Sequence, residues 1–541
     1  MSNNKKCKTC MFQINENEMA SHHYICPKCG AYFSYHAMER IQDIADNNSY
    51  HPLSFEINTK KYLPDEKYKH ELQVVKEKTG LDEAITCGRI TIGGIPVVIG
   101  VMDNRFMMAS MGRIVGERVC QLFRFAIRKR LPVILFCCSG GARMQEGIIS
   151  LMQMEKTAAM AKKHNDAGLL YISVLTNPTM GGVTASFATL ADVILAENGA
   201  MIGFAGARVI EQNTGEKLPP GFQSAAFQKE HGFVDVVLNR DEIKPTLAFL
   251  LRLHHLKRKV LPMNISWDRI SNIQHGEQTA PICPWDQVAI ARSKSRPTSL
   301  DYISRIFPDF YELHGDRISG DDHAVVAGLA TFYGIPITVI GQQKGKKDPQ
   351  DAIFRNFGMP SPCGYRKAIR LAKQAEKFDR PIVFFVDTIG AACGSDAESK
   401  GQGNAIAEML YEMSAIRVPV YSIVIGEGGS GGALAFAVGN EVDILENAVY
   451  SIITPEGYAS IVWKDSSRAA EAAAQLKMTS SDLYDLHVVD KIIPEYSPVS
   501  ISNIEQVCND IVFSLHSFLT EKSRKRKSKI TKERFLRFTR Y

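Results

Sequence analysis

Two glycine-rich stretches carry the clearest chemical signal in this sequence. They span residues 179–186 and 428–435, and their central pairs are Gly181–Gly182 and Gly431–Gly432. Each follows an apolar, β-type run and precedes small residues that favour a helix, so each predicts a strand, a glycine turn and a helix N-terminus. Backbone N–H groups and a helix dipole would then point at one spot, which suits an anion or a developing oxyanion. The alternative is that the glycines only permit close packing of helix on strand.

A second group with chemical potential lies near the start of the chain. Four cysteines have the spacing C-x2-C-x15-C-x2-C and are Cys7, Cys10, Cys26 and Cys29. Two such knuckles can place four thiolates around one tetrahedral metal, which predicts a zinc ribbon with one Zn²⁺ per chain. Four sulfur ligands leave no open position, so the predicted zinc is structural. Two disulfides are the alternative, and the absence of a secretion signal argues against them.

The elements that position the glycines recur along the chain. Ile95 recurs as Ile335, a shift of 240 residues, Pro132 as Pro381, a shift of 249, and Gly181 as Gly431, a shift of 250. Each match lies within a similar run of strand-forming residues. Ordered matches at nearly constant spacing predict two related α/β domains in tandem, at about 85–255 and 300–496. The alternative is chance similarity between common strand–turn patterns.

Composition places the remaining segments. We predict a zinc ribbon at 1–35, a first domain at 36–255, a linker with a connecting helix at 256–300, a second domain at 301–496, and a C-terminal helix with a basic tail at 497–541. The net charge is +6, and residues 521–541 alone hold ten Lys or Arg and two Glu. We expect this tail to be solvated, with binding to an acidic partner or nucleic acid as the alternative.

The sequence shows no uncharged apolar run of about 18 residues and no signal peptide, so we expect no membrane span and a cytoplasmic protein. We find no Ser-His-Asp order, P-loop or Rossmann fingerprint. Residues 428–432 have the G-x-S-x-G spacing of a nucleophile elbow around Ser430. The surrounding glycines favour backbone amides as the working groups, with a nucleophilic Ser430 as the alternative. A duplicated oxyanion hole suits a reaction in which two carbonyl-like oxygens gain negative charge together.

The motifs then resemble a known family. The first half resembles the β subunit of bacterial acetyl-CoA carboxylase carboxyltransferase, through the four cysteines and the segments 110–112, 139–146, 177–183, 203–206 and 216–223. The second half resembles the α subunit, through the segments 301–303, 312–317, 355–360, 426–435 and 455–457. These subunits are usually separate chains, so the sequence resembles a fused β–α version.

This resemblance implies a crotonase-type (ClpP/crotonase) spiral core in each half. It implies carboxyl transfer from carboxybiotin, carried on a separate biotin carboxyl carrier protein, to acetyl-CoA, which yields malonyl-CoA for fatty acid synthesis. A biotin carboxylase would be a further partner, and a homodimer would equal two β and two α units. The nucleic-acid binding of some zinc ribbons could coexist with this activity.

The resemblance also assigns site residues. It implies oxyanion holes at Gly181 and Gly182 and at Gly431 and Gly432, without assigning the thioester to either. Further substrate-binding positions are Gly140, Gly141, Ala142, Arg143, Gly428 and Gly429. Arg143 would meet the CoA phosphates or the carboxylate, with a structural arginine as the alternative.

The second half departs from the family pattern in several places. Ile389 and Cys393 stand where prolines are usual, and Cys363 stands where an acidic residue is usual. Residues 348–351 also differ from the usual basic and acidic pattern. Another crotonase-like acyl-CoA enzyme, such as a hydratase, is the alternative function. It would need paired catalytic glutamates near the glycine turns, and the sequence offers no convincing pair.

Overall fold

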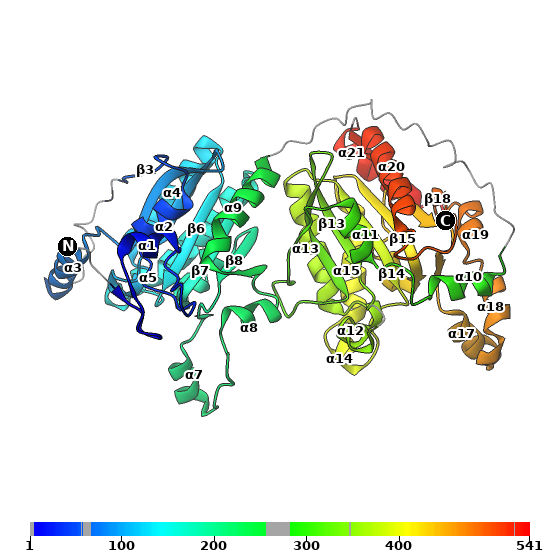
Figure 1. Ribbon diagram of the computed structural model, residues 1–541, viewed down its shortest axis with the longest axis horizontal. Coiled ribbons are helices and arrows are strands. Elements are labelled where there is room, and N and C mark those ends of the chain that lie inside the picture. The colour runs from blue at the N-terminus through cyan, green and yellow to red at the C-terminus, as the bar shows by residue number, and fades with distance from the viewer. Residues whose placement is uncertain (1–4, 56, 58–65, 256–281, 346–347, 524) are drawn as a thin grey trace. The chain divides into compact units, whose positions relative to one another are not determined.

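The computed structural model describes residues 5–541 except 56, 58–65, 256–281, 346–347 and 524. It forms two compact units, unit 1 (Met1–His255) and unit 2 (Leu256–Tyr541) (Figure 1). Residues 256–281 of the predicted linker lie outside the described residues. Among the residues described, no helix is long and apolar enough to cross a membrane.

Unit 1 is built on an eight-stranded sheet. Its order is β10 (Val236–Leu238), β8 (Val193–Glu197), β7 (Tyr171–Met180), β6 (Val133–Ser139), β5 (Ile95–Met102), β4 (Ile85–Ile92) and β3 (His51–Pro52), and β9 (Ile202–Gly203) pairs with the end of β7. Strands β5, β6, β7, β8 and β10 run parallel, whereas β4 and β5 form an antiparallel hairpin.

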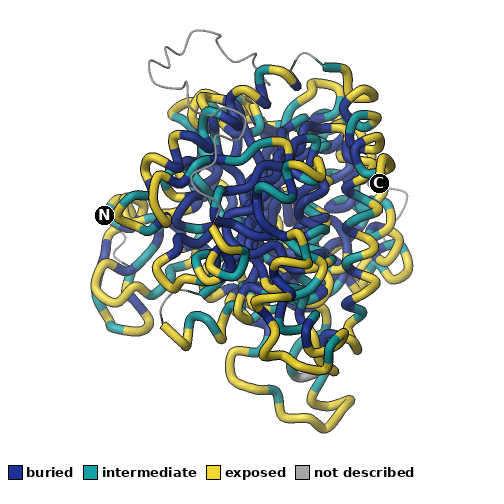
Figure 2. Tube along the Cα trace, turned by 90° about the vertical axis from the view of Figure 1, so that its right-hand side faces the viewer, coloured by how far each residue is buried: buried dark blue, intermediate teal, exposed yellow. Residues whose placement is uncertain are grey.

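The helices of unit 1 are α1 (Glu16–Ser21), α2 (Ala37–Ile44), α3 (Glu66–Thr79), α4 (Arg113–Lys129), α5 (Ile148–Asp166), α6 (Gly181–Thr184), α7 (Ala207–Thr214), α8 (Ala225–Glu230) and α9 (Arg240–His255). Helices α2, α4 and α9 pack against strands β4 and β5 of the sheet. Every residue of β6 is buried, as expected for a parallel strand covered on both faces. Helix α4 turns a stripe that includes Val119, Leu122 and Phe123 to the core. Figure 2 shows the buried residues gathered inside and the exposed ones in outer loops.

Unit 2 repeats the arrangement. Its sheet order is β11 (Tyr311–Glu312), β12 (Val325–Phe332), β13 (Ile335–Gln342), β14 (Ile382–Thr388), β15 (Val420–Gly429), β16 (Glu441–Leu445) and β18 (Lys491–Ile493), and β17 (Val449–Ser451) pairs with the end of β15. Its helices are α10 (Pro284–Ala291), α11 (Ser299–Ile306), α12 (Pro349–Phe354), α13 (Pro362–Lys377), α14 (Ser395–Ser399), α15 (Gln402–Ala415), α16 (Ser430–Leu434), α17 (Pro455–Tyr458), α18 (Ala469–Gln475), α19 (Ser480–Asp485), α20 (Ile504–Ser523) and α21 (Lys527–Phe538). The predicted pair of related α/β domains is confirmed.

The strand pairing fixes the register of the repeat. Ser139 lies opposite Thr179 in unit 1, and Thr388 lies opposite Gly428 in unit 2, so both positions shift by 249 residues. With this shift, Gly182 corresponds to Gly431, not to Gly432. The 250-residue match of Gly181 with Gly431 was therefore off by one, because a serine, Ser430, takes the place of the first glycine.

The basic tail differs from the solvated segment that we expected. Residues 527–538 form α21, and the Arg534 side chain is buried. Its guanidinium donates to the carbonyl oxygens of Met413, Ile416 and Val418 and to Asn440 Oδ1, at 2.6 to 2.9 Å. Burial lowers the pKa of Arg534 to about 10. A charge count cannot reveal this role, since it depends on carbonyl groups more than a hundred residues away in the chain.

We expect Arg534→Met to release α21, because it leaves buried carbonyl oxygens unpaired at a cost of about 1–3 kcal/mol each. The midpoint of thermal unfolding should fall, and trypsin should cleave within α21 faster than in the parent chain. Lys532→Met, at an exposed position of the same helix, is the matched control and should change neither. Equal protease resistance in both variants would contradict the docking role of Arg534.

Candidate active site and metal centre

The loop after β6 presents one free backbone donor. Met111 N–H donates to Gly141 O at 2.8 Å, and Arg143 N–H donates to Met111 O at 3.0 Å. Because these flanking groups face Met111, the N–H of Ala142 between them points to the other side. It has no acceptor among the described residues. The N–H of Gly140 is not free, because it donates to Met108 O at 2.8 Å.

The start of α6 presents a second free donor. Gly181 has a left-handed backbone with φ +60°, and a Cβ there would lie 2.9 Å from Gly141 Cα, so only glycine fits this approach. Its N–H donates to Phe204 O, whereas the N–H of Gly182 has no acceptor in the described part of the chain. A Cβ on Gly182 would lie 3.5 Å from the Ala142 nitrogen. Ala142 and Gly182 therefore lie on adjoining segments, and we call their free N–H groups the first amide pair. Two such donors, if they converge, are the kind of groups that an oxyanion hole requires.

Unit 2 builds an equivalent pair. Ala392 N–H donates to Pro360 O at 2.9 Å, which matches the bond from Arg143 to Met111 at the 249-residue shift. The N–H of Ala391 is therefore the counterpart of the Ala142 donor, and the N–H of Gly431 is the counterpart of the Gly182 donor. Neither has an acceptor among the described residues. We call Ala391 and Gly431 the second amide pair.

Glycines also bring the second pair together. A Cβ on Gly432 would lie 2.5 Å from the Ala391 nitrogen, so the first turn of α16 packs directly on the loop that carries Ala391. Gly428 and Gly429 are the last residues of β15. A Cβ on Gly429 would clash with Ile389 O. Gly429, which we predicted to bind substrate, therefore packs against the loop that carries Ala391.

Sequence reasoning missed part of this site. It did not assign Ala391, although the repeat would have mapped Ala142 onto it. It also missed two turns of three consecutive residues with positive φ, Met107–Ala109 and 356–358. Such turns are strained for residues other than glycine and cluster at functional sites. Met108 and Phe357 carry no composition signal for this backbone, so only the structure reveals it.

The four cysteines form one cluster. Their sulfur atoms all lie within 4.8 Å of one another, and Cys7–Cys29 and Cys10–Cys26 are each 3.6 Å apart. A tetrahedral site with metal–sulfur bonds of about 2.3 Å requires sulfur separations of roughly 3.8 Å, so the arrangement fits a zinc-sized ion. The two knuckles match in backbone bonding: Met11 N–H donates to Cys7 O and Gly30 N–H to Cys26 O.

Comparison with known proteins identifies the family. The model of acetyl co-enzyme A carboxylase carboxyltransferase-like proteins matches residues 267–541. Acetyl-coenzyme A carboxylase carboxyl transferase subunits beta/alpha of Natranaerobius thermophilus are 52% identical over 506 residues, which cover 91% of this chain and 83% of that protein. The chain belongs to the acetyl-CoA carboxylase carboxyl transferase family. The protein of the same name from Clostridium tetani is 47% identical and covers 94% of this chain, with 87% of its own length matched.

A solved structure agrees with the family in fold. Transcarboxylase 12S, solved with methylmalonyl-coenzyme A and methylmalonic acid bound, superposes with a TM-score of 0.70 at 22% identity and covers 91% of this chain and 90% of its own. At this identity the likeness concerns the fold alone. The predicted crotonase-like architecture and the predicted fusion of β-type and α-type halves are confirmed.

In this carboxyl transferase Arg143 is part of the protein interior. Its side chain is fully buried and makes a two-bond ion pair with Glu83, at 2.6 and 3.0 Å. It also donates to Ser110 Oγ and O and to Tyr68 Oη. Burial opposes the charge, but the Glu83 carboxylate outweighs it and raises the pKa of Arg143. These contacts favour the structural alternative for the Arg143 side chain.

Ser430 lies in an exposed position at the start of α16, with φ +57°. No hydrogen bond to its hydroxyl occurs within the described residues, so no base is in place to activate it. This geometry favours the backbone amides over a nucleophilic serine. Among the departures from the family pattern, Ile389 and Cys393 lie on either side of Ala391 in its loop. Cys363 lies in α13 beside Ser361, with Sγ 3.2 Å from Ser361 Oγ.

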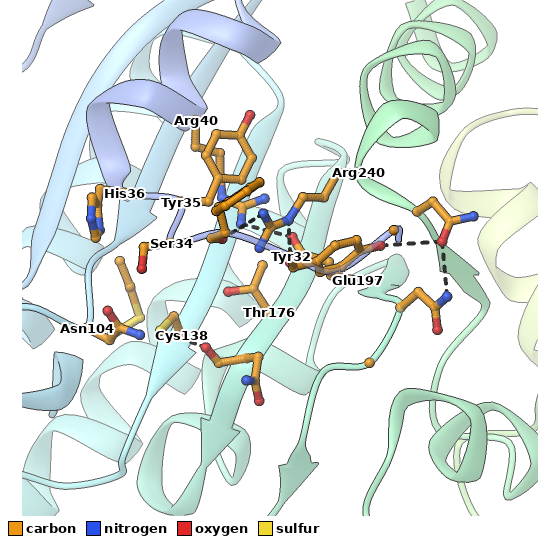
Figure 3. Close-up of a pocket in the computed structure, with 17 residues that line it drawn as sticks. Tyr32, Ser34, Tyr35, His36, Arg40, Asn104, Cys138, Thr176, Glu197 and Arg240 are labelled. Atoms are coloured by element: carbon orange, nitrogen blue, oxygen red, sulfur yellow. Dashed lines mark hydrogen bonds and ion pairs between the residues drawn. The ribbon is translucent and has the colours of Figure 1, made fainter. Parts of the chain in front are cut away.

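A polar pocket of about 560 Å³ lies where the ribbon meets the carboxyl ends of β6, β7 and β8 (Figure 3). Arg240 donates to Glu197 at 2.9 Å and to the carbonyl oxygens of Tyr24 and Phe33 in the ribbon segment. Arg40 forms an ion pair with the same carboxylate at 2.9 Å. This buried cluster fastens the ribbon to the sheet that carries the first amide pair.

We expect Gly432→Ala to abolish most carboxyl transfer, because the new Cβ would push the Ala391 amide out of place. Loss of one oxyanion donor typically costs about 10²- to 10³-fold in kcat. Gly403→Ala, in α15 of the same unit with nothing within 4 Å of its Cβ, is the matched control. Steady-state kinetics on both variants tests this, and a kcat near the parent value in Gly432→Ala would contradict the second amide pair.

Proposed function

We propose that this chain transfers the carboxyl group of carboxybiotin to acetyl-CoA and that its two amide pairs stabilise the two oxygens that become negative. The observation that carries the proposal is the duplication of free N–H donors on equivalent loops of two related units. Membership in the acetyl-CoA carboxylase carboxyl transferase family supports the choice of substrates.

The chemistry needs little from side chains. The C–N bond of carboxybiotin breaks to give CO₂ and a ureido anion, whose oxygen one amide pair stabilises. That anion removes a proton from the methyl group of acetyl-CoA, and the thioester oxygen of the resulting enolate is stabilised by the other pair. The enolate carbon then attacks CO₂ to give malonyl-CoA. Donors fixed in place before the reaction cost no reorganisation as charge develops.

The contacts of nearby glutamates argue against a hydratase. Glu146 follows the first loop and accepts hydrogen bonds from Tyr68 Oη and Arg113 N–H, each at 2.6 Å. Glu427, in β15, is bound by Lys344 and Arg292 at 3.1 and 2.7 Å. These cations outweigh the effect of burial and lower the pKa of Glu427. Both carboxylates are held by the protein, not placed as an acid–base pair for water addition.

The deciding experiment incubates the purified chain with acetyl-CoA and carboxybiotin on its carrier domain and follows malonyl-CoA by mass spectrometry. We expect malonyl-CoA to form only when both substrates are present. Propionyl-CoA in parallel reports the acyl preference, and crotonyl-CoA reports hydration. Hydration of crotonyl-CoA without carboxyl transfer would overturn the proposal in favour of a hydratase.

The proposal includes partners and compartment. A biotin carboxyl carrier protein would deliver the carboxyl group, a biotin carboxylase would load it, and the chain would act as a homodimer, which light scattering of the purified protein tests. Free buried thiols such as Cys87, Cys120 and Cys137 are typical of a reducing compartment, so we place the reaction in the cytoplasm.

The proposal also assigns structural Zn²⁺ to the cysteine cluster. Zinc would complete the fold of the ribbon, as four thiolates leave it no open coordination position. Because the ribbon carbonyls of Tyr24 and Phe33 bind Arg240, the metal would support the wall of the pocket in Figure 3.

We expect the purified chain to contain one zinc ion, measured by plasma mass spectrometry, and Cys26→Ser to contain much less. The variant should also unfold at a lower temperature, since metal binding and ribbon folding are coupled. Cys283→Ser removes an exposed free thiol outside the cluster and should retain the zinc. Full zinc content in Cys26→Ser would refute this ligand set.

A further inference from the structure

Gln342, the last residue of β13, is fully buried beside the second amide pair. Its Nε2 donates to Gly432 O at 3.0 Å, and its Oε1 accepts from Asp387 N–H at 3.2 Å. Gly432 lies in the first turn of α16, next to Gly431. Asp387 lies in β14, one residue before Thr388, where the chain turns into the loop that carries Ala391. One side-chain amide therefore joins the two segments that provide the two donors.

The two bonds restrain separate segments at once. Other bonds, such as Ala392 N–H to Pro360 O, restrain one segment at a time. Without the Gln342 amide, the Gly432 carbonyl and the Asp387 N–H would lose these partners in the interior. An unpaired buried group is costly, so a chain lacking this amide would be expected to shift the loop or the helix turn to satisfy it. A shift of about 1 Å in a catalytic group can cost about 10²-fold in rate.

The first unit lacks this device. Val325 lies opposite Gln342 in the β12–β13 pair, and Ile85 lies opposite Met102 in the β4–β5 pair, so Met102 occupies the corresponding strand end. A thioether cannot both donate to a carbonyl and accept from an N–H with the strength of an amide. Unit 1 therefore shows that the same strand end accommodates a methionine, so Gln342→Met introduces a side chain that this fold already contains.

Charged groups surround the Gln342 contact. Asp387 Oδ1 accepts from Lys344 Nζ at 2.7 Å and from Glu427 N–H at 2.9 Å. Lys344 and Arg292 also bind the Glu427 carboxylate. Gln342, which carries no charge, thus lies next to a charged network of Asp387, Glu427 and the half-buried Lys344.

We propose that Gln342 is a positioning residue that sets the geometry of the second amide pair. It touches neither substrate in this proposal, and it acts through the Gly432 carbonyl and the Asp387 amide. The inference rests on the proposed carboxyl transfer and adds to it a side chain that no motif marks.

The first test replaces Gln342 with the residue of the first unit. Gln342→Met should lower kcat by about 10- to 100-fold and leave KM for acetyl-CoA within a factor of about two, because donors that act mainly in the transition state affect kcat and kcat/KM together. Gln287→Met is the matched control. Gln287 is also a buried glutamine of unit 2, but its Nε2 bonds to Glu446 O and Ala448 O, so its loss should lower thermal stability without lowering kcat.

A second variant separates positioning from general stability. In Gln342→Glu, a protonated carboxyl group can donate to Gly432 O and accept from Asp387 N–H, whereas the ionised group cannot donate to Gly432 O. It also adds a negative charge next to the network of Asp387, Glu427, Lys344 and Arg292. The kcat of Gln342→Glu should therefore be higher at low pH and fall as pH rises through the pKa of the new group. Gln342→Met should show no such added ionisation relative to the parent chain.

The outcomes are distinguishable. If the parent chain makes no malonyl-CoA, the proposed function fails before Gln342 is tested. If the parent is active and Gln342→Met retains its kcat, or if Gln342→Glu follows the parent pH profile, the positioning role is refuted. If Gln287→Met loses as much kcat as Gln342→Met, the effect is general destabilisation, which also refutes it.

Discussion

Four backbone N–H groups that have no acceptor in the part of the chain that the structure describes are the constraint around which both units are organised. Folded proteins pair nearly all buried backbone donors, and a free donor is tolerated only where the surroundings prevent it from finding a partner. Here the residues that follow the two loop donors, Ala142 and Ala391, are bonded in the opposite direction. Arg143 N–H is fixed by Met111 O, and Ala392 N–H by Pro360 O. A hydroxyl group at each strand end, from Ser139 or Thr388, then accepts the N–H of Gly141 or Gly390.

The two units support the same backbone geometry with different side chains. In unit 1, the buried ion pair of Arg143 and Glu83 joins the loop to the entry of β4. The position equivalent to Arg143 in unit 2 is Ala392, whose short side chain cannot form an ion pair. In unit 2, Gln342 and the network of Lys344, Asp387 and Glu427 restrain the loop instead. Breaking a buried ion pair by removing one partner is strongly destabilising. The two loops are therefore free to differ in sequence while their amides keep one arrangement.

Much of this organisation could be predicted from the sequence, and the failures have physical reasons. Strand runs, glycine turns and the repeat predicted two α/β units, and the cysteine spacing predicted the cluster. The register was off by one because Ser430 adopts the left-handed backbone that Gly181 adopts in unit 1. Ala142 was predicted only as a substrate-binding position and Ala391 was not predicted at all. Every residue other than proline has an N–H, and only the chain path shows which one is left free. Arg534 was counted as tail charge because its acceptors are distant in sequence.

Because the free donors belong to the backbone, the side chains around them do not have to supply hydrogen bonds to the reacting oxygens. A substitution on the loop that carries Ala391 changes what surrounds the second pair without removing a donor, provided the chain path is kept. Ile389 is partly exposed at 37% and Cys393 is exposed, and both lie within two residues of Ala391. The Ala392 N–H remains bonded to Pro360 O despite both departures. The unusual residues of unit 2 therefore leave the path of the loop, and with it the free N–H of Ala391, as it is in unit 1.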